Sequence, residues 1–119
     1  MKRIKSMEEI NADIVLLDSE DKQIIEEIVK YEEEIFHEGA IGIWNIKPFI
    51  KYGKVYALVS LEARLISAIE IMKDFEEHKA YIYGFFTKES FRNKGYGDMF
   101  LKNILEELHN IYGINKIEL

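Results

Sequence analysis

The six residues from Arg92 to Gly97 read Arg-Asn-Lys-Gly-Tyr-Gly and are the part of the sequence best suited to chemistry. Gly95 and Gly97 can adopt backbone conformations that are closed to other residues, and they let a bulky group approach the main chain. If a helix begins here, its first amide groups lack partners and carry roughly half a positive charge. Arg92 adds a guanidinium fork and Lys94 adds a point charge. The segment is therefore suited to binding a diphosphate.

Other phosphate-binding motifs do not match this segment. The dinucleotide-binding fingerprint needs a third glycine and an acidic residue about 20 positions further on. A P-loop needs a Gly-Lys pair followed by serine or threonine, and the residues after Gly95 do not provide one. Two glycines in six residues also suit an ordinary turn between a strand and a helix. The elements on either side must therefore show whether this turn has a function.

The residues that flank the turn predict a buried strand and a long helix. Residues 80–87 are apolar or aromatic on both alternating faces, which indicates a strand that is covered on both sides and central in its sheet. Apolar residues recur at helical spacing from Met99 to Tyr112, and Gly113 is a typical helix end. A turn between such a strand and such a helix exposes successive amide groups to an anion.

The rest of the chain predicts an α+β fold. The expected elements are a strand at 14–17, a helix at 24–36 that ends by Gly39, a second helix at 41–52, strands at 55–59 and 65–72, a polar turn at 74–79 and a last strand at 114–119. In the second helix, Asn45 suits a cap and Pro48 is expected near the start. The order strand, helix, helix, three strands, helix, strand indicates a mixed, mostly antiparallel sheet of about five strands flanked by helices. Only the last strand-helix-strand unit is expected to be parallel.

Composition and charge limit the class of protein. A chain of 119 residues with 48% hydrophobic residues suits one folded domain over residues 1–119. The net charge of -6 gives no attraction to nucleic acid or to an anionic membrane, so neither is an expected partner. The sequence has no cysteine and three scattered histidines, which excludes disulfides and predicts no metal site. Residues 1–5 are basic, but Glu8 and Glu9 follow them instead of an apolar run, and we expect a cytoplasmic protein.

With its flanking strand and helix, the turn resembles the core motif of the GCN5-related N-acetyltransferase (GNAT) family. In that motif Arg or Gln, two residues, Gly, one residue and Gly or Ala follow the fourth strand, as Arg92, Gly95 and Gly97 do here. The resemblance covers roughly the whole chain and implies acetyl-CoA as the cofactor. It places the cofactor pyrophosphate on the main-chain amides of the turn, which here are those of Arg92, Asn93, Lys94, Gly95, Tyr96 and Gly97. It also implies that pantetheine pairs with the main chain of Phe85, Phe86 and Thr87.

The resemblance further implies an N-acetyltransferase, which moves an acetyl group from acetyl-CoA to a primary amine of a small molecule or protein. Such a transfer needs a base for the ammonium, a group that polarises the thioester carbonyl and an acid for the departing thiolate. Family members such as the histone acetyltransferases carry a glutamate base where this chain has Tyr81. A phenol is a poor base near pH 7, because it holds its proton up to about pH 10. We therefore rank Glu70 first as the catalytic residue, Tyr81 second and His78 third.

Each of these side chains also has a structural interpretation. Tyr81 suits the packing of a buried strand, Glu70 a solvated strand and His78 a polar turn. The family places acceptor recognition around its first two helices, where this chain has Trp44 and Phe49, although aromatic residues at helical spacing are usually part of a core.

The carboxyl end departs from the family pattern, because the sequence stops at the strand that another helix and two more strands should follow. That helix often carries the acid tyrosine. The last strand becomes a bare edge, from which we expect a homo-oligomer formed through this strand, or a fragment of a longer acetyltransferase. The alternatives to an enzyme are a CoA-binding or protein-interaction module without catalysis, and a purely structural domain.

Overall fold

One mixed sheet with helices on both faces makes up the fold. The structure is a computed structural model and describes residues 1–74, 76 and 78–119. The strands are β1 (Lys2–Met7), β2 (Ala12–Leu16), β3 (Lys54–Ser60), β4 (Leu65–Lys73), β5 (Lys79–Thr87) and β6 (Lys116–Glu118). The helices are α1 (Lys22–Phe36), α2 (Gly42–Tyr52) and α3 (Tyr96–Tyr112), with short 3-10 turns at Glu8–Ile10, His37–Gly39 and Glu89–Phe91. The predicted α+β class is confirmed.

The strands lie in the order β1-β2-β3-β4-β5-β6. All neighbours are antiparallel except β5 and β6, which are parallel and joined through α3, as the sequence predicts. The prediction of about five strands missed β1. Its sequence, Lys-Arg-Ile-Lys-Ser-Met, is polar at most positions and only Met7 is buried, so it lacks the apolar alternation that marks a strand. Pairing with β2 holds it in the sheet.

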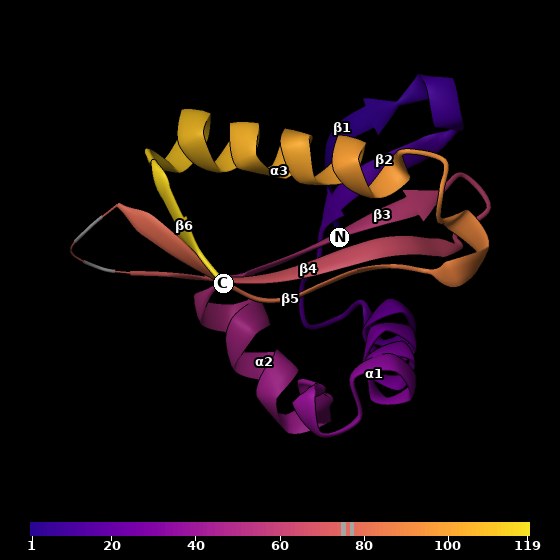
Figure 1. Ribbon diagram of the computed structural model, residues 1–119, viewed down its shortest axis with the longest axis horizontal. Helices are drawn as coiled ribbons and strands as arrows, with labels where there is room; N and C mark the ends of the chain where they lie inside the picture. Colours follow the sequence, from indigo (N-terminus) through magenta and orange to yellow (C-terminus); the bar gives the residue numbers. More distant parts are fainter. Residues whose placement is uncertain (75, 77) are drawn as a thin grey trace.

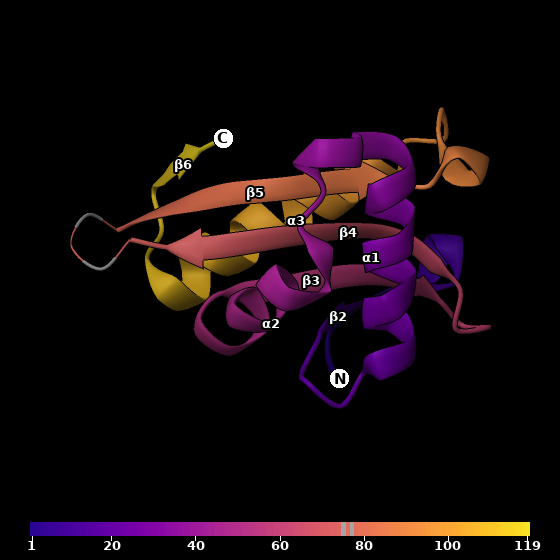
Figure 2. The same cartoon turned by 90° about the horizontal axis from the view of Figure 1, so that it is seen from below.

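The two faces of the sheet carry different helices. Figure 1 shows α3 above the sheet and α1 with α2 below it, and Figure 2 shows α1 crossing the strands. One apolar core lies under α3 and includes Phe100, Ile104 and Leu108. The other lies under α1 and α2 and includes Ile28 and Ile46. The helix predicted at 24–36 begins two residues earlier, and α3 ends at Gly113, whose N–H bonds the His109 carbonyl at 3.0 Å.

The prediction that β5 is covered on both faces and central is wrong. Buried and accessible residues alternate along it, and Tyr81 and Tyr83 keep about two fifths of their surface exposed. Tyr83 packs against Phe49 of α2 on one face, and only the three residues of β6 pair along the other edge of β5. The aromatic side chains that made the strand look buried therefore lie on a half-open face.

Two smaller expectations also change. Helix α2 begins at Gly42, so Asn45 is not its cap and Pro48 lies inside the helix, where its missing N–H leaves the Trp44 carbonyl without its usual donor. The polar turn predicted at 74–79 falls partly on Phe75 and Glu77, which lie outside the described residues.

Within the described ranges, none of the helices is both long enough and apolar enough to cross a membrane.

Candidate functional site

The Arg92–Gly97 turn joins β5 to α3 through a very close contact between strand and helix. A Cβ atom at Gly97 would lie 2.7 Å from Thr87 Oγ1, so no larger residue fits without a shift. Gly95 has a φ of +78° and Asn93 a φ of +64°, which is the left-handed region that glycine and asparagine tolerate best. The two glycines therefore have separate roles, because Gly97 permits the approach and Gly95 permits the turn.

The beginning of α3 presents amide groups without partners. The first helical hydrogen bond runs from the Met99 N–H to the Gly95 carbonyl at 3.1 Å. Among the described residues, the N–H groups of Tyr96, Gly97 and Asp98 have no backbone acceptor. An open cavity of about 330 Å³ lies at this point, lined by Thr87, Phe91, Arg92, Asn93, Gly95, Tyr96, Gly97 and Asp98. Its unpaired amides and the positive end of the helix dipole suit the pyrophosphate of a nucleotide cofactor.

The charged side chains of the turn have different positions. Arg92 braces the turn, since its Nε donates to the Thr87 carbonyl at 2.9 Å and its Nη2 to the Tyr31 hydroxyl at 3.4 Å. Tyr31 also accepts the Glu89 N–H at 3.0 Å. Lys94 is exposed, and Asp98 brings a negative charge to the cavity. The main chain, more than these side chains, makes the site attractive to an anion.

The edge of β5 beside this cavity is open along most of its length. β6 pairs only with Lys79, Ala80 and Tyr81, and Figure 2 shows it beside the first part of β5. Among the described residues, nothing pairs with that edge of β5 between Ile82 and Thr87. A free strand edge can hydrogen-bond an extended group, such as the pantetheine arm of CoA.

A β-bulge in this open part of β5 changes which side chains face which helices. Glu70 of β4 pairs with Gly84, whereas the next residue, Ile71, pairs with Ile82, so Tyr83 is the extra residue. Tyr83 faces the side of α1 and α2, where its ring lies 5.4 Å from that of Phe49 and its hydroxyl donates to the Gly39 carbonyl at 3.4 Å. Gly84 faces the same side.

After the bulge, the side chains of β5 again alternate between the two faces of the sheet, but the odd-numbered residues now face α3 and the even-numbered residues face α1. Phe85 packs toward α3, with its ring 6.2 Å from that of Phe100, and Phe86 packs on Tyr31 of α1 at 4.8 Å. The Thr87 hydroxyl bonds the Ser67 hydroxyl at 2.8 Å. The predicted cofactor residues Phe85, Phe86 and Thr87 thus lie on the open part of β5, directly before the turn.

Two buried carboxyl groups meet at Gly84. Glu70 of β4 and Glu32 of α1 are both fully buried. A Cβ atom at Gly84 would lie 2.5 Å from Glu70 Oε1 and 3.5 Å from both Glu32 oxygens. Glu32 Oε1 accepts the Ile41 N–H at 3.4 Å, whereas neither Glu70 oxygen has a hydrogen-bond partner on the described protein groups. Burial, together with the nearby Glu32, holds the pKa of Glu70 far above its ordinary value.

The other sequence candidates are dispersed. Tyr81 is half-exposed and lies opposite Glu118 of β6. His78 precedes β5 at the end remote from the turn, and its carbonyl accepts the Asn115 N–H at 2.9 Å. A strand rises about 3.3 Å per residue, which puts His78 roughly 30 Å from Thr87. Trp44 is 79% exposed on α2. Apart from Glu70, the sequence named Tyr81 and His78 for catalysis and Trp44 and Phe49 for acceptor recognition. Only Tyr81 and Phe49 lie near the open part of β5.

Comparisons with known proteins agree with this geometry. The model of the acetyltransferase (GNAT) family matches residues 16–119. The chain belongs to the GNAT acetyltransferase family. No curated protein matches it.

Solved acetyltransferases share the fold of this GNAT domain at low sequence identity. An IAA acetyltransferase from Bacillus cereus is 16% identical, with a TM-score of 0.66 over 89% of this chain and 63% of its own. A ribosomal-protein-alanine N-acetyltransferase from Brucella melitensis is 11% identical, with a TM-score of 0.70 over 91% and 78% of the two chains. N-acetylglutamate synthase from Neisseria gonorrhoeae, complexed with coenzyme A and N-acetyl-glutamate, is 18% identical, with a TM-score of 0.65 over 88% and 23%. The domain therefore spans less than two thirds of the Bacillus cereus enzyme.

Sequence reasoning did not assign a functional role to Glu32, Tyr31 or Tyr83 in this GNAT domain. The sequence could have indicated a role for Glu32, because this residue occupies a core-facing position in the helical repeat of residues 24–36. A glutamate is rarely buried there unless another group pairs with it. No sequence pattern indicated a role for Tyr31, because its contacts to Arg92 and Phe86 join residues that are far apart in the sequence. Tyr83 depends on the bulge, which the sequence pattern does not reveal.

Proposed function

We propose that this GNAT domain binds acetyl-CoA at the Arg92–Gly97 turn and transfers its acetyl group to a primary amine. The observation that carries the proposal is the set of unpartnered amides at the start of α3, beside an open strand edge. When bound, acetyl-CoA supplies an activated acetyl thioester. The amides of Tyr96, Gly97 and Asp98 would hold the pyrophosphate, and the main chain of Phe85, Phe86 and Thr87 would hold pantetheine.

The catalytic residues are proposed with changed roles. Glu70 retains its proton at neutral pH because of its raised pKa, so it does not act as a free base there. With Glu32 it positions the bulge, because the two carboxyl groups fill the space that Gly84 leaves open. Tyr81 is half-exposed on β5, and its hydroxyl is proposed to relay a proton, taking the one that leaves the amine while it gives its own to solvent water. His78 remains a remote candidate at the far end of the strand.

The nature of the acceptor is open between small molecules and proteins. Solved structures of the same fold carry names that refer to IAA, a ribosomal-protein alanine and N-acetylglutamate, so the fold alone does not select among amines. The half-exposed rings of Tyr81 and Tyr83 and the adjacent Phe49 make the acceptor side of β5 aromatic. An amine that carries an apolar group is therefore favoured.

The proposal is tested by calorimetry and by turnover. Acetyl-CoA and desulfo-CoA are expected to bind the full chain, and acetyl-CoA is expected to acetylate members of an amine panel that includes small amines and peptides with free amino groups. Binding without turnover across the panel would favour a CoA-binding module. A chain that binds neither ligand at millimolar concentration would reject the cofactor site altogether.

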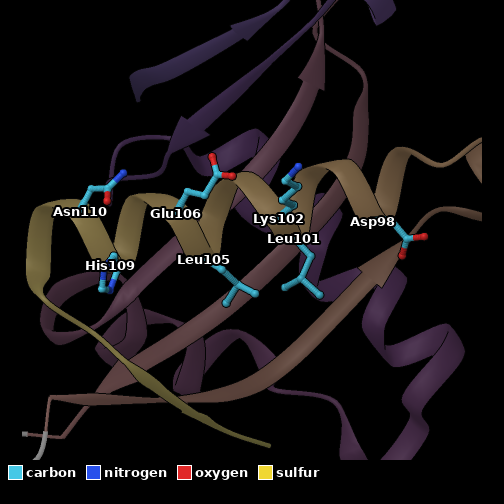
Figure 3. Close-up of a pocket in the computed structure, with 7 residues that line it drawn as sticks. All are labelled: Asp98, Leu101, Lys102, Leu105, Glu106, His109 and Asn110. Atoms are coloured by element: carbon cyan, nitrogen blue, oxygen red, sulfur yellow. The ribbon is translucent and has the colours of Figure 1, made fainter.

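We also propose that β6 joins two copies of the chain. In an antiparallel pair centred on Ile117, Lys116 of each copy would lie opposite Glu118 of the other, so the strand is complementary to itself. Ile117 and Leu119 are exposed at this edge. Figure 3 shows Leu101, Leu105 and His109 pointing to the side of α3 on which β6 lies, beside an open cavity of about 490 Å³. These side chains would extend the interface.

Charge reversal at β6 tests this association. By light scattering after size exclusion, the wild type is expected to be dimeric, and Lys116→Glu is expected to weaken the dimer about tenfold because it places like charges opposite each other twice. The double variant Lys116→Glu/Glu118→Lys restores opposite charges between the copies but removes the 2.9 Å ion pair of Glu118 with Lys79, so it is expected to recover part of the dimer affinity lost in Lys116→Glu. A wild type that stays monomeric at low micromolar concentration would exclude this interface.

A further inference from the structure

A second cavity, of about 890 Å³, lies between the first turns of α1 and one side of α2 that runs from Ile43 to Lys51, close to the end of β2. It shares no residue with the cavity at the Arg92–Gly97 turn. The end of α1 at this cavity is opposite to the end that leads to Gly39 and Tyr83. Its size lies within the roughly 300–1,000 Å³ of typical small-molecule sites. The cavity is therefore a candidate for a ligand other than the cofactor.

The inner wall of this cavity is apolar. Leu17 and Ile25 belong to the core under α1 and α2 and are 3% and 6% exposed, and Ile50 packs against the same core. Ile43 is 39% exposed and completes the wall from α2. Because Leu17 and Ile25 are already almost covered, the apolar surface left in water is mainly that of Ile43 and the half-buried Ile50. Covering that surface stabilises a complex by about 25 cal/mol per Å² removed from water.

Three lysines lie around the apolar wall, in a chain whose net charge is -6. Lys22 comes from α1, and Lys47 and Lys51 come from one side of α2 at a spacing of four residues. The ammonium groups of Lys47 and Lys51 lie 5.0 Å and 5.3 Å from the ring centres of Trp44 and Tyr52. In the part of the chain that the structure describes, none of the three lysines has an ion pair.

Two acidic residues face the same cavity but do not neutralise the lysines. Asp18 uses Oδ1 to accept the Glu20 N–H at 2.8 Å and Oδ2 to pair with the Met1 ammonium at 3.2 Å. Glu26 is the other acidic residue of the lining. The three lysines therefore face only one carboxylate, that of Glu26, that is not already bound by a neighbouring backbone amide or ammonium group. The local charge is positive, although the whole chain is acidic.

We propose that this cavity binds a small amphipathic anion, namely a carboxylate on an aliphatic or aromatic body of several carbons. The apolar body would cover Ile43 and Ile50 above the buried Leu17 and Ile25, and the carboxylate would lie among Lys22, Lys47 and Lys51. Lysine ammonium groups act as point charges, so they recognise the negative charge of a ligand more than the planar geometry of its carboxylate. The site is independent of the proposed acetyl transfer and goes beyond it.

The experiment titrates octanoate into the full chain and follows the backbone amide resonances by NMR. Shifts are expected at Lys22, Ile25, Lys47 and Ile50 and not at Gly95 or Gly97. Octan-1-ol and octylammonium test the charge, and each is expected to bind at least about tenfold more weakly, which corresponds to about 1.4 kcal/mol. Because acetyl-CoA binding is measured on other resonances, failure of either site is distinguishable from failure of the other.

Charge reversal supplies the matched variants. Lys47→Glu/Lys51→Glu is expected to lower octanoate affinity at least about tenfold and to make octylammonium the better ligand, a gain that a misfolded chain would not show. Lys30→Glu changes an exposed residue of α1 outside the cavity and is expected to leave octanoate affinity within about twofold. Equal binding of octanoate and octan-1-ol, shifts confined to other residues or an unchanged preference in the double variant would each overturn the proposal.

Discussion

Replacement of Glu70 with glutamine is expected to remove a loss of stability that the wild-type chain undergoes as the pH rises. Burial and Glu32 raise the pKa of Glu70 from 4.5 to about 10, so between these values the folded chain binds a proton that the unfolded chain releases. The free energy of unfolding therefore falls with increasing pH in this window, by up to about 1.4 kcal/mol per pH unit. The contribution is fully favourable only below pH 4.5.

Urea denaturation at a series of pH values measures this effect. Glutamine resembles the protonated side chain in shape and charge, so Glu70→Gln should match the wild type near pH 5 and exceed it increasingly at pH 7, 8 and 9. The gain should increase from pH 7 to pH 9, by at most about 1.4 kcal/mol per pH unit. Glu62→Gln, in an exposed turn, is the control and should stay within about 0.5 kcal/mol of the wild type throughout. Parallel curves for Glu70→Gln and wild type would show that Glu70 is ionised in the folded chain.

The result bears on function, because a protonated carboxyl group cannot take a proton from an ammonium. From the sequence, Glu70 ranked first as the base, ahead of Tyr81 and His78. The structure instead places it under Gly84, between β4 and α1 and without access to any of the cavities described above. A fully buried carboxyl group that keeps its proton suits a structural role at the bulge more than proton exchange with solvent.

The features that sequence predicted well are those set by local pattern. Apolar period gave α1 and α3 to within a few residues, and Gly113 gave the end of α3. The Arg92–Gly97 turn was predicted between a strand and a helix, and the structure places it there with the expected conformation at Gly95. In each case the residues that determine the feature are neighbours in the sequence.

The features that sequence missed depend on contacts between distant segments. β1 is a strand because β2 pairs with it, and its own residues give no strand pattern. The bulge at Tyr83 follows from a mismatch between β4 and β5, and it moves Gly84 to the face of α1. A strict two-residue alternation through residues 80–87 assigns Gly84 to the opposite face, so it cannot bring Glu32 and Glu70 together.

Substitution of Gly97 by alanine is expected to weaken both the fold and the cofactor site. The new Cβ would lie 2.7 Å from Thr87 Oγ1, and this oxygen is held by its 2.8 Å bond to Ser67. The beginning of α3 must then move away from β5, at a cost of about 1–3 kcal/mol in the free energy of unfolding. The same movement displaces the amides of Tyr96 and Asp98, so CoA affinity should fall about tenfold, or about 1.4 kcal/mol. Denaturation and calorimetry measure the two effects separately.

A double-mutant cycle with Thr87→Ala separates this collision from a general loss of flexibility at Gly97. Without Oγ1, the Cβ at position 97 has its nearest contacts at 3.7 Å to Phe85 and 3.8 Å to the Cβ of residue 87, which are ordinary distances. Thr87→Ala alone should cost about 1 kcal/mol, because Ser67 loses its partner. The double variant should then cost less than the sum of the single variants by at least about 1 kcal/mol and should regain CoA affinity. Additive losses would show that Gly97 is needed for its backbone and not for the space it leaves beside Thr87.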